Sequence, residues 1–243
     1  MRVLPVVDLM GGLVVRGVGG RRDEYRPIHS LLCDQPTPDA VGQSFRRLGL
    51  SEAYLADLDA IGGADPAWPV YRTLIECGLS LWVDAGLTSV AGARRLAEFS
   101  HRGQSLAAVV AGSESLADRG ALADMVSAVE GRLVFSLDLR GGVPLVADPA
   151  WRHCPPEDIA SQVYQMGVRR FIVLDLSGVG MDRGVPTAAL CRQLRRLDSS
   201  LEIVSGGGVR GHDDLLSLAA AGCNAALVAS ALHDGRLCAA DLF

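Results

Sequence analysis

The chain has 243 residues, of which 49% are hydrophobic and 21% are charged, and its mean hydropathy is +0.25. This composition excludes a disordered or low-complexity protein, because so much apolar surface must be buried in a core. The net charge of −5 comes without a basic stripe, which argues against nucleic acid as a partner. No apolar run reaches the roughly 18 residues of a membrane span and no signal-peptide pattern is present, so we expect a cytosolic protein.

Short runs of Val, Ile, Leu and Ala alternate with longer amphipathic stretches, a pattern typical of strands and helices in a parallel sheet. The eight predicted strands are 3–8, 53–57, 79–84, 107–112, 133–138, 170–175, 202–205 and 225–229. The predicted helices are 39–49, 66–77, 89–99, 115–129, 156–166, 186–197 and 211–221, with a short one near 233–240. Eight strand–helix pairs without a linker predict a single α/β domain, a (βα)8 TIM barrel.

The second half of the chain repeats the first. The segment 7–13 (VDLMGGL) returns as 137–143 (LDLRGGV), and 109–113 returns as 227–231. We therefore predict half-barrels of four βα units at about 1–130 and 131–243, related by a pseudo-twofold axis. In such a barrel the first strand faces the fifth, so Asp8 is predicted to lie opposite Asp138.

Five predicted strands end in aspartate, at the carboxyl ends where barrels of this type bind ligands: Asp8, Asp57, Asp84, Asp138 and Asp175. A glycine pair follows shortly after Asp8 and Asp138 and lets the backbone turn over the barrel mouth, so we interpret these two as catalytic. Two carboxylates in a partly dry site cannot both ionise readily, which divides acid and base duties between them. Asp57 and Asp175 are equivalent by the repeat; they either brace the barrel rim or bind substrate.

Glycines close the seventh predicted strand at Gly206, Gly207 and Gly208, and Ala229 and Ser230 close the eighth. Backbone N–H groups of such a glycine run can approach an anion closely, and these loops are the usual phosphate cradle of (βα)8 barrels. The sequence therefore predicts a phosphate site here, with a tight turn that binds no ligand as the alternative.

The repeat places a matching cradle in the first half, at Gly86, Gly112 and Ser113. Asp84 stands there at the position that Gly206 has in the second half. A carboxylate next to a phosphate dianion is unfavourable. This first-half cradle is therefore either vacant or receives a cationic group such as an amine.

The polar segment 16–38 follows the first predicted strand and has the length of a lid. Its arginines, Arg16 among them, either clamp an anionic substrate or belong to a solvated loop. Trp151 either stacks on a planar ligand ring or packs a helix. The five histidines and six cysteines lack metal-ligand spacing, and the chain contains no lysine for a Schiff base, so we expect neither a metal nor another cofactor.

Together these motifs resemble the histidine-biosynthesis barrel family, which contains phosphoribosylformimino-AICAR ribonucleotide (ProFAR) isomerase and the cyclase subunit of imidazole glycerol phosphate synthase. The resemblance runs along the whole chain, most specifically at 6–16 (VVDLMGGLVVR), 136–138 (SLD), 57–58 (DL) and 205–210 (SGGGVR). It implies a TIM barrel, a phosphorylated small-molecule substrate and an Amadori-type conversion of an aminoaldose to an aminoketose. In this family Asp8 corresponds to the general base, and Asp138 to a residue that assists or acts as acid.

The chain departs from the family at several positions. Val179 stands where the isomerase has an acidic residue, Leu174 where it has threonine, and Arg16 where the cyclase has lysine. Because valine carries no proton, we expect a diverged relative that acts by proton transfer at carbon on a smaller or singly phosphorylated substrate. The alternatives are an enzyme of another cofactor pathway, such as one for a pterin-type one-carbon carrier, and a non-catalytic barrel that binds a phosphorylated metabolite. A second copy or a partner subunit is compatible with the sequence, which identifies no surface for either.

Overall fold

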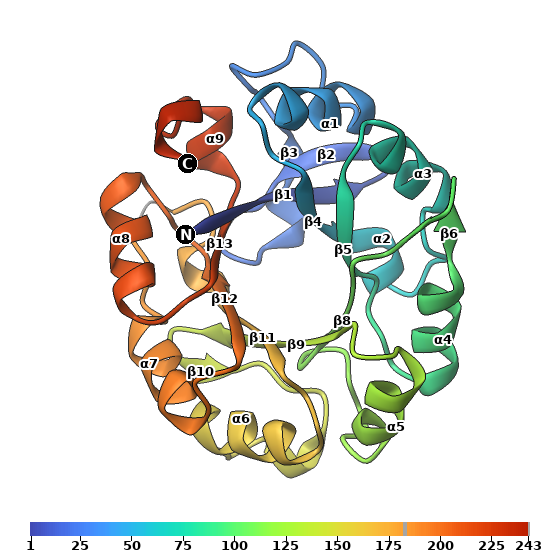
Figure 1. Ribbon diagram of the computed structural model, residues 1–243, viewed down its shortest axis with the longest axis vertical. Coiled ribbons are helices and arrows are strands. Elements are labelled where there is room, and N and C mark those ends of the chain that lie inside the picture. Colours follow the sequence, from blue (N-terminus) through green and yellow to red (C-terminus); the bar gives the residue numbers. More distant parts are fainter. Residues whose placement is uncertain (182–183, 243) are drawn as a thin grey trace.

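The computed structural model describes residues 1–181 and 184–242. Within these ranges eight parallel strands close into a ring, and β13 completes it by pairing with β1 (Figure 1). In ring order the strands are β1 (Arg2–Met10), β4 (Glu52–Asp57), β5 (Ser80–Asp84), β8 (Ala108–Gly112), β9 (Leu133–Arg140), β11 (Arg170–Asp175), β12 (Glu202–Gly206) and β13 (Ala225–Val228). The predicted (βα)8 barrel is confirmed, and each predicted strand ends within two residues of the observed one.

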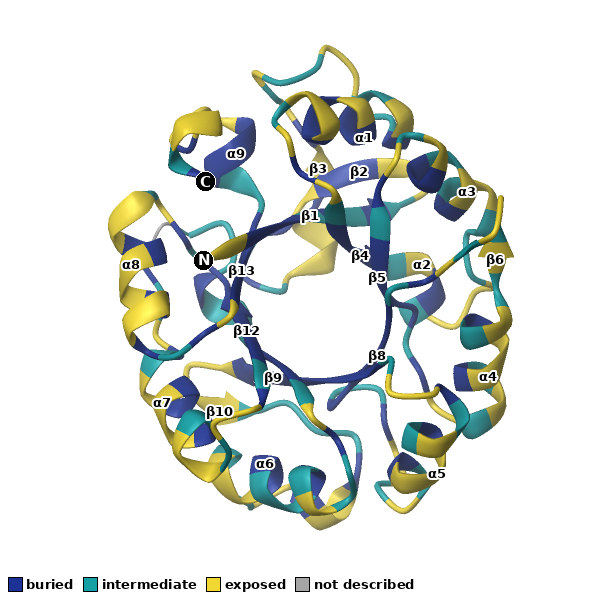
Figure 2. Ribbon diagram, viewed as in Figure 1, coloured by how far each residue is buried: buried dark blue, intermediate teal, exposed yellow. Residues whose placement is uncertain are grey.

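Helices surround the ring and bury the faces that they turn toward it (Figures 1 and 2). They are α1 (Pro38–Arg47), α2 (Leu58–Ile61), α3 (Trp68–Glu76), α4 (Val90–Glu98), α5 (Ala121–Ala128), α6 (Pro156–Gln165), α7 (Ala188–Leu197), α8 (His212–Ala220) and α9 (Ser230–His233). Local sequence sets several starts. The side chains of Thr37 and Ser89 accept N–H groups of the first turns of α1 and α4, and Pro38 begins α1.

Three details of the helix prediction are wrong. The fifth helix begins at Ala121 instead of 115, because Ser115 and Leu116 donate to the carbonyl of Gly112 in a turn. The last helix, α9, begins at Ser230 and ends at His233, before the left-handed Gly235 (φ 74°). The short helix α2 was not predicted. The half-barrel boundary after residue 130 falls in the turn between α5 and β9.

Shorter elements decorate the loops. The strands are β2 (Leu13–Arg16), β3 (Arg26–Pro27), β6 (Ser100–His101), β7 (Gln104–Ser105) and β10 (Val143–Pro144), and the 3-10 helices are η1 (Arg22–Glu24), η2 (Pro149–Trp151), η3 (Leu176–Gly178) and η4 (Ala239–Asp241). β2 and β3 continue antiparallel from β1. This pairing anchors the polar segment after the first strand to the barrel wall.

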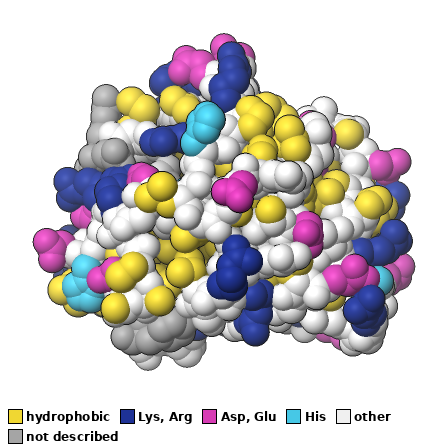
Figure 3. Space-filling view, turned by 90° about the horizontal axis from the view of Figure 1, so that it is seen from above, with side chains coloured by type: hydrophobic (Ala, Val, Ile, Leu, Met, Phe, Trp, Pro, Cys, Tyr) yellow, Lys and Arg dark blue, Asp and Glu magenta, His cyan; other side chains and the backbone are white. Residues whose placement is uncertain are grey.

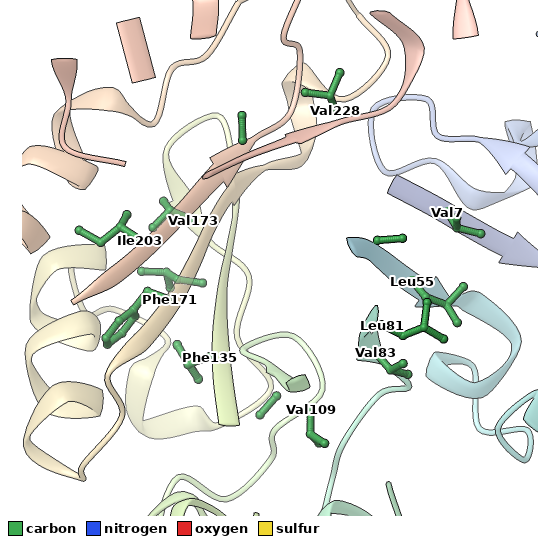
Figure 4. Close-up of a cluster of buried hydrophobic side chains, with 14 of the residues drawn as sticks. Val7, Leu55, Leu81, Val83, Val109, Phe135, Phe171, Val173, Ile203 and Val228 are labelled. Atoms are coloured by element: carbon green, nitrogen blue, oxygen red, sulfur yellow. The ribbon is translucent and has the colours of Figure 1, made fainter. Parts of the chain in front are cut away.

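The barrel wall separates two cores, because alternate side chains of a strand point to opposite faces. One set fills the barrel interior and contains Leu4, Tyr54, Trp82, Val110, Val134, Ile172, Val204 and Leu227. The other packs beneath the helices, and Figure 4 labels its members Val7, Leu55, Leu81, Val83, Val109, Phe135, Phe171, Val173, Ile203 and Val228. The interior set gives the barrel a packed floor beneath the carboxyl ends of the strands.

The surface carries mixed charge. Figure 3 shows arginines and acidic side chains interspersed over the side of the molecule that it draws. No helix in the described part of the chain is both long enough and apolar enough to cross a membrane.

Candidate active site

A cavity of about 790 Å³ opens at the carboxyl ends of the strands. Its lining comes from β1, β4, β5 and β9, from the segment between β2 and α1, and from the loops that follow β11, β12 and β13. Polar groups from both halves of the barrel therefore converge on one space. This is the position at which (βα)8 barrels bind their ligands.

Three aspartates of the barrel strands line the cavity: Asp8 in β1, Asp84 at the end of β5, and Asp138 in β9. Asp23 in η1 and Asp234 after α9 line it as well. β1 and β9 lie on opposite sides of the ring, four strands apart in either direction. Burial is the main cause that raises the pKa of each of the three strand carboxyls: to about 7 for Asp8, about 6 for Asp84 and about 8 for Asp138. At neutral pH the site therefore holds carboxyl groups in both protonation states.

The three carboxyl groups differ in their hydrogen bonds. Asp138 accepts from the Ser136 hydroxyl at 2.9 Å through Oδ1. Asp84 accepts from the N–H of Gly86 at 3.0 Å through Oδ1 and from the Tyr54 hydroxyl at 3.3 Å through Oδ2. Asp8 has no side-chain hydrogen bond to a residue in the described ranges. Asp84 is thus fixed at both oxygens, whereas Asp8 and one oxygen of Asp138 are open to a ligand.

One cation from the segment between β2 and α1 balances this acidic group. Arg22 lies in η1, lines the cavity and lowers the pKa of Asp8, Asp84 and Asp138, against the larger effect of burial. Its guanidinium pairs with Glu114 at 2.8 Å, on the loop after β8. The polar segment therefore reaches across the mouth, and its action as a lid stays a prediction.

The same segment also packs on the loop after β11. The N–H of Gly19 donates to the carbonyl of Val179 at 2.8 Å. A Cβ on Gly180 would lie 2.2 Å from the carbonyl oxygen of Gly17, so only glycine permits this approach. The lid is in contact with the second half of the barrel.

The predicted phosphate loops, which follow β12 and β13, line the same cavity. Gly207, Gly208, Ala229 and Ser230 line it, and Arg16 lies beside them. Gly207 and Gly208 have φ values of 80° and 109°, which side chains rarely adopt. Within the described ranges, the N–H groups of Gly207, Gly208 and Ser230 have no hydrogen-bond acceptor. These free donors suit an anion.

A buried histidine ties the lid to this part of the cavity. His233 in α9 shares a hydrogen bond of 2.9 Å between Nδ1 and the Ser30 hydroxyl, and Ser30 accepts the N–H of Leu32 at 3.0 Å. Burial lowers the pKa of His233 to about 4, and the charge of Arg16 adds to this shift. The imidazole is therefore neutral at physiological pH and acts as a structural link.

Two of the predicted site aspartates brace the rim and do not line the cavity. Asp57 is fully buried and accepts the N–H groups of Ala60 and Ala67 and the hydroxyl of Tyr71, at 3.2, 2.8 and 2.7 Å. Asp175 accepts from the N–H groups of Gly141 and Gly142 in the tight turn after β9. Both carboxylates accept hydrogen bonds from the protein itself, the arrangement expected of the rim-bracing alternative.

Four other predicted positions also lie outside the cavity lining. Trp151 is fully buried, packs edge-on against Phe135 at 5.7 Å and donates through Nε1 to Gln162, so it cannot stack on a ligand. Gly206, Gly112 and Ser113 lie below the mouth in the barrel wall; the Ser113 hydroxyl donates to the carbonyl of Leu145 and accepts the N–H of Asp138. Their roles are to shape the walls. Gly86, in contrast, lines the cavity as predicted.

Sequence reasoning missed Tyr54 and Glu114, which both line the cavity. Tyr54 is 6% exposed, and burial raises its pKa well above the ordinary value. Tyr54 could have been found from the alternation of side chains along a strand. In β4, Tyr54 and Ala56 lie on the same, inward face, where they pair with Val6 and Asp8 of β1. Glu114 lies in a loop, where no such alternation applies.

The fold and the site together define a (βα)8 barrel protein with a ligand cavity that is lined by carboxyl groups of β1, β5 and β9 and by free backbone donors of the loops after β12 and β13. A family model described as "Histidine biosynthesis protein" matches residues 2–238. The chain belongs to this family. The resemblance seen in the sequence is thereby confirmed.

Individual relatives cover nearly the whole chain. An uncharacterized protein of Methanocaldococcus jannaschii is 29% identical over 237 residues, which is 98% of this chain and 95% of the relative. A protein of Halothermothrix orenii named 1-(5-phosphoribosyl)-5-((5-phosphoribosylamino)methylideneamino) imidazole-4-carboxamide isomerase, which is ProFAR isomerase, is 30% identical over 245 residues. An isomerase of the same name from Thermus thermophilus is 30% identical over 242 residues, and each of these two alignments covers 98% of this chain and 96% of the relative.

Proposed function

We propose that this protein is an isomerase that converts a phosphorylated aminoaldose into the aminoketose by acid–base proton transfer. The observation that carries the proposal is the position of Asp8 and Asp138, on opposite sides of the barrel and in one cavity. The names of the relatives from Halothermothrix orenii and Thermus thermophilus support the same class of reaction.

Asp8 is the proposed general base. Moving a carbonyl group from C1 to C2 of a sugar requires a base that removes the proton at C2 and an acid that supplies one elsewhere. A pKa of about 7 keeps Asp8 partly ionised at neutral pH and more basic than an ordinary carboxylate. With no hydrogen-bond donor in the described ranges, Asp8 is free to take the proton.

Asp138 is the proposed acid. A pKa of about 8 keeps it largely protonated at neutral pH, and Ser136 occupies only Oδ1. Oδ2 can therefore carry the proton that opens the sugar ring at its oxygen. This role replaces the acid that the isomerase family has where this chain has Val179.

The substrate carries one phosphate in this proposal and is smaller than ProFAR, whose name contains two phosphoribosyl groups. Gly207, Gly208, Ser230 and Arg16 provide one set of anion-binding groups. The equivalent end of the first half holds Asp84, and Leu174 and Val179 present apolar surface to the cavity. The pathway is histidine synthesis or a cofactor pathway such as that of a pterin-type one-carbon carrier.

Deuterium exchange tests the reaction class. Incubation in D2O with 5-phosphoribosylamine derivatives that bear one phosphate should place deuterium at C1 of the aminoketose product, detected by NMR, and Asp8→Asn should abolish this incorporation. Absence of exchange with every derivative, together with retained phosphate binding, would favour the non-catalytic barrel.

Complementation tests the substrate. A singly phosphorylated substrate predicts that the chain does not restore growth to a strain that lacks ProFAR isomerase, or to one that lacks the cyclase. Growth restored by the wild type but not by Asp8→Asn in the isomerase strain would make ProFAR the substrate and leave the reaction class in place.

A further inference from the structure

The two halves of the barrel mouth differ in charge at equivalent positions. Gly206 at the end of β12 corresponds to Asp84 at the end of β5. Asp84 is 8% exposed and held at both oxygens, by Gly86 and Tyr54. A carboxylate fixed in this place repels a second phosphate, so the two ends of a ligand must differ in charge.

A small volume over Gly112 lies between two carboxyl groups. A Cβ atom built on Gly112 would lie 3.7 Å from Oδ2 of Asp84 and 3.5 Å from Oδ2 of Asp138. Gly112 follows Val110 by two residues in β8, so this position is on the inward face of the barrel. Because residue 112 is glycine, both oxygens face space that no side chain fills.

Asp138 supplies an oxygen that lacks a partner. It is only 6% exposed, Ser136 donates to Oδ1, and no residue within 1–181 or 184–242 donates to Oδ2. This oxygen therefore faces the cavity without a hydrogen bond from these residues, and in the proposed function it carries the catalytic proton.

The balance of charge favours a cationic donor. Arg22, the cation that acts on Asp8, Asp84 and Asp138 together, is itself paired with Glu114 at 2.8 Å. No group of three or more His, Cys, Asp and Glu side chains in the described ranges is arranged to hold a metal ion. An ammonium group, with three N–H donors and one positive charge, suits the carboxylate of Asp84 without further ligands.

We propose that Asp84 makes this site specific for a monophosphate that also carries a protonated amino group, and that this group donates to Oδ2 of Asp84, over Gly112. The phosphate of the same ligand lies at Gly207 and Gly208. The inference rests on the proposed function for the position of the phosphate. It names the substrate class as amino-bearing monophosphates.

Calorimetric titration of the whole chain with two series of probes tests this specificity. One series is ω-aminoalkyl phosphates of increasing chain length, and the other is alkyl phosphates of the same lengths. At the length that spans both ends, the aminoalkyl phosphate should bind about tenfold more tightly, the size of one charge-assisted hydrogen bond. Asp84→Asn should remove this preference and leave alkyl phosphate affinity unchanged.

Asp118→Asn is the matched control. Asp118 accepts the N–H of Gly120, two residues on, at 2.8 Å, in the pattern that Asp84 forms with Gly86, but it is exposed and outside the cavity lining. This variant should keep the full preference for the aminoalkyl series. Circular dichroism of Asp84→Asn confirms that the barrel is folded.

The remaining outcomes overturn the inference in distinguishable ways. Equal affinity for the two series at every length, or a preference that survives Asp84→Asn, overturns the amine site while the phosphate cradle stands. Binding of Mg²⁺ that Asp84→Asn abolishes assigns the carboxylates to a metal ion instead. Failure to bind either series overturns the phosphate cradle of the proposed function and this inference with it.

Discussion

The two ends of the barrel differ in how their charged side chains are paired. At the amino ends of the strands, Arg2 forms ion pairs with Glu52 and Glu202, and Arg170 pairs with Glu202 at 2.7 Å. The guanidinium groups of Arg2 and Arg170 also lie over the ring of Trp82, at 5.9 and 4.2 Å. Each charge of this group has a partner, so this end closes the barrel.

At the carboxyl ends, in contrast, Asp8, Asp84 and Asp138 share the charge of Arg22, which Glu114 also holds. Burial without matched cations costs stability, and the raised pKa values of the three aspartates express that cost. The difference supports the proposal that the mouth is the end that binds ligand and performs the chemistry. In this proposal the buried, poorly matched carboxyl groups at the mouth serve binding and catalysis, whereas the paired charges at the amino ends of the strands do not.

The largest expected effect is on turnover, and it distinguishes a substitution at the mouth from one at the amino ends of the strands. Asp8→Asn should lower turnover by roughly 10³-fold, the usual range for loss of a general base, and leave the melting temperature unchanged or slightly raised. Glu202→Gln should do the reverse, with normal turnover and a melting temperature lower by about 2–4 °C, as expected if the network contributes about 1 kcal/mol.

Steady-state kinetics and calorimetry of the two variants measure both quantities. Asp118→Asn, an exposed carboxylate outside the cavity, serves as the control for neutralising an aspartate. Full turnover in Asp8→Asn would remove the catalytic assignment, whatever its stability.

The second prediction concerns the pH dependence of kcat/KM. Asp8 must be ionised to act as base, so activity should rise with pH through about 7; Asp138 must be protonated to act as acid, so activity should fall through about 8. The profile is therefore a narrow bell between these values. Asp138→Asn should lower the maximum and remove the falling limb, and a limb that persists in this variant would assign the acid elsewhere.

Much of the fold could be predicted from the sequence because each strand carries its own signal. Apolar runs that end in aspartate or glycine located all eight strands, and the repeat of 7–13 at 137–143 placed Asp8 opposite Asp138. The helix after β8 was placed too early, because nothing in the composition of 115–120 distinguishes a turn from a first helical turn.

The site was harder to predict where its contacts depend on the path of loops. Asp57 and Asp175 end strands as Asp84 does, yet only Asp84 of the three lines the cavity, while the other two accept N–H and hydroxyl groups that the folded chain brings to the rim. The pairing of Arg22 with Glu114 joins residues far apart in sequence through the path of the lid. Contacts between such distant residues leave no local pattern in the sequence.

The third prediction concerns the stability that the protein loses when the carboxyl groups at the mouth ionise, which appears as a pH dependence of unfolding. Because folding raises the pKa of Asp8, Asp84 and Asp138, the folded state binds more protons than the unfolded state between about pH 4 and 8. Stability from these groups is therefore greatest below their unfolded pKa and is lost as pH rises through the folded values.

Thermal unfolding followed from pH 5 to 9 should show a falling melting temperature, and Asp138→Asn should reduce that fall. Glu202→Gln, at the opposite end of the barrel, should leave the slope as in the wild type. An equal fall in Asp138→Asn would show that the mouth carboxylates do not cause the dependence.

The smallest expected effect comes from the lid. Arg22→Gln removes the cation that lowers the pKa of Asp8 and Asp138, so both limbs of the kcat/KM profile should move to higher pH, by roughly a few tenths of a unit. Arg26→Gln is the matched control, because Arg26 lies in the same segment but donates to the backbone carbonyls of Asp23 and Tyr25. An unshifted profile in Arg22→Gln would mean that the lid arginine serves Glu114 alone and does not act on Asp8 or Asp138.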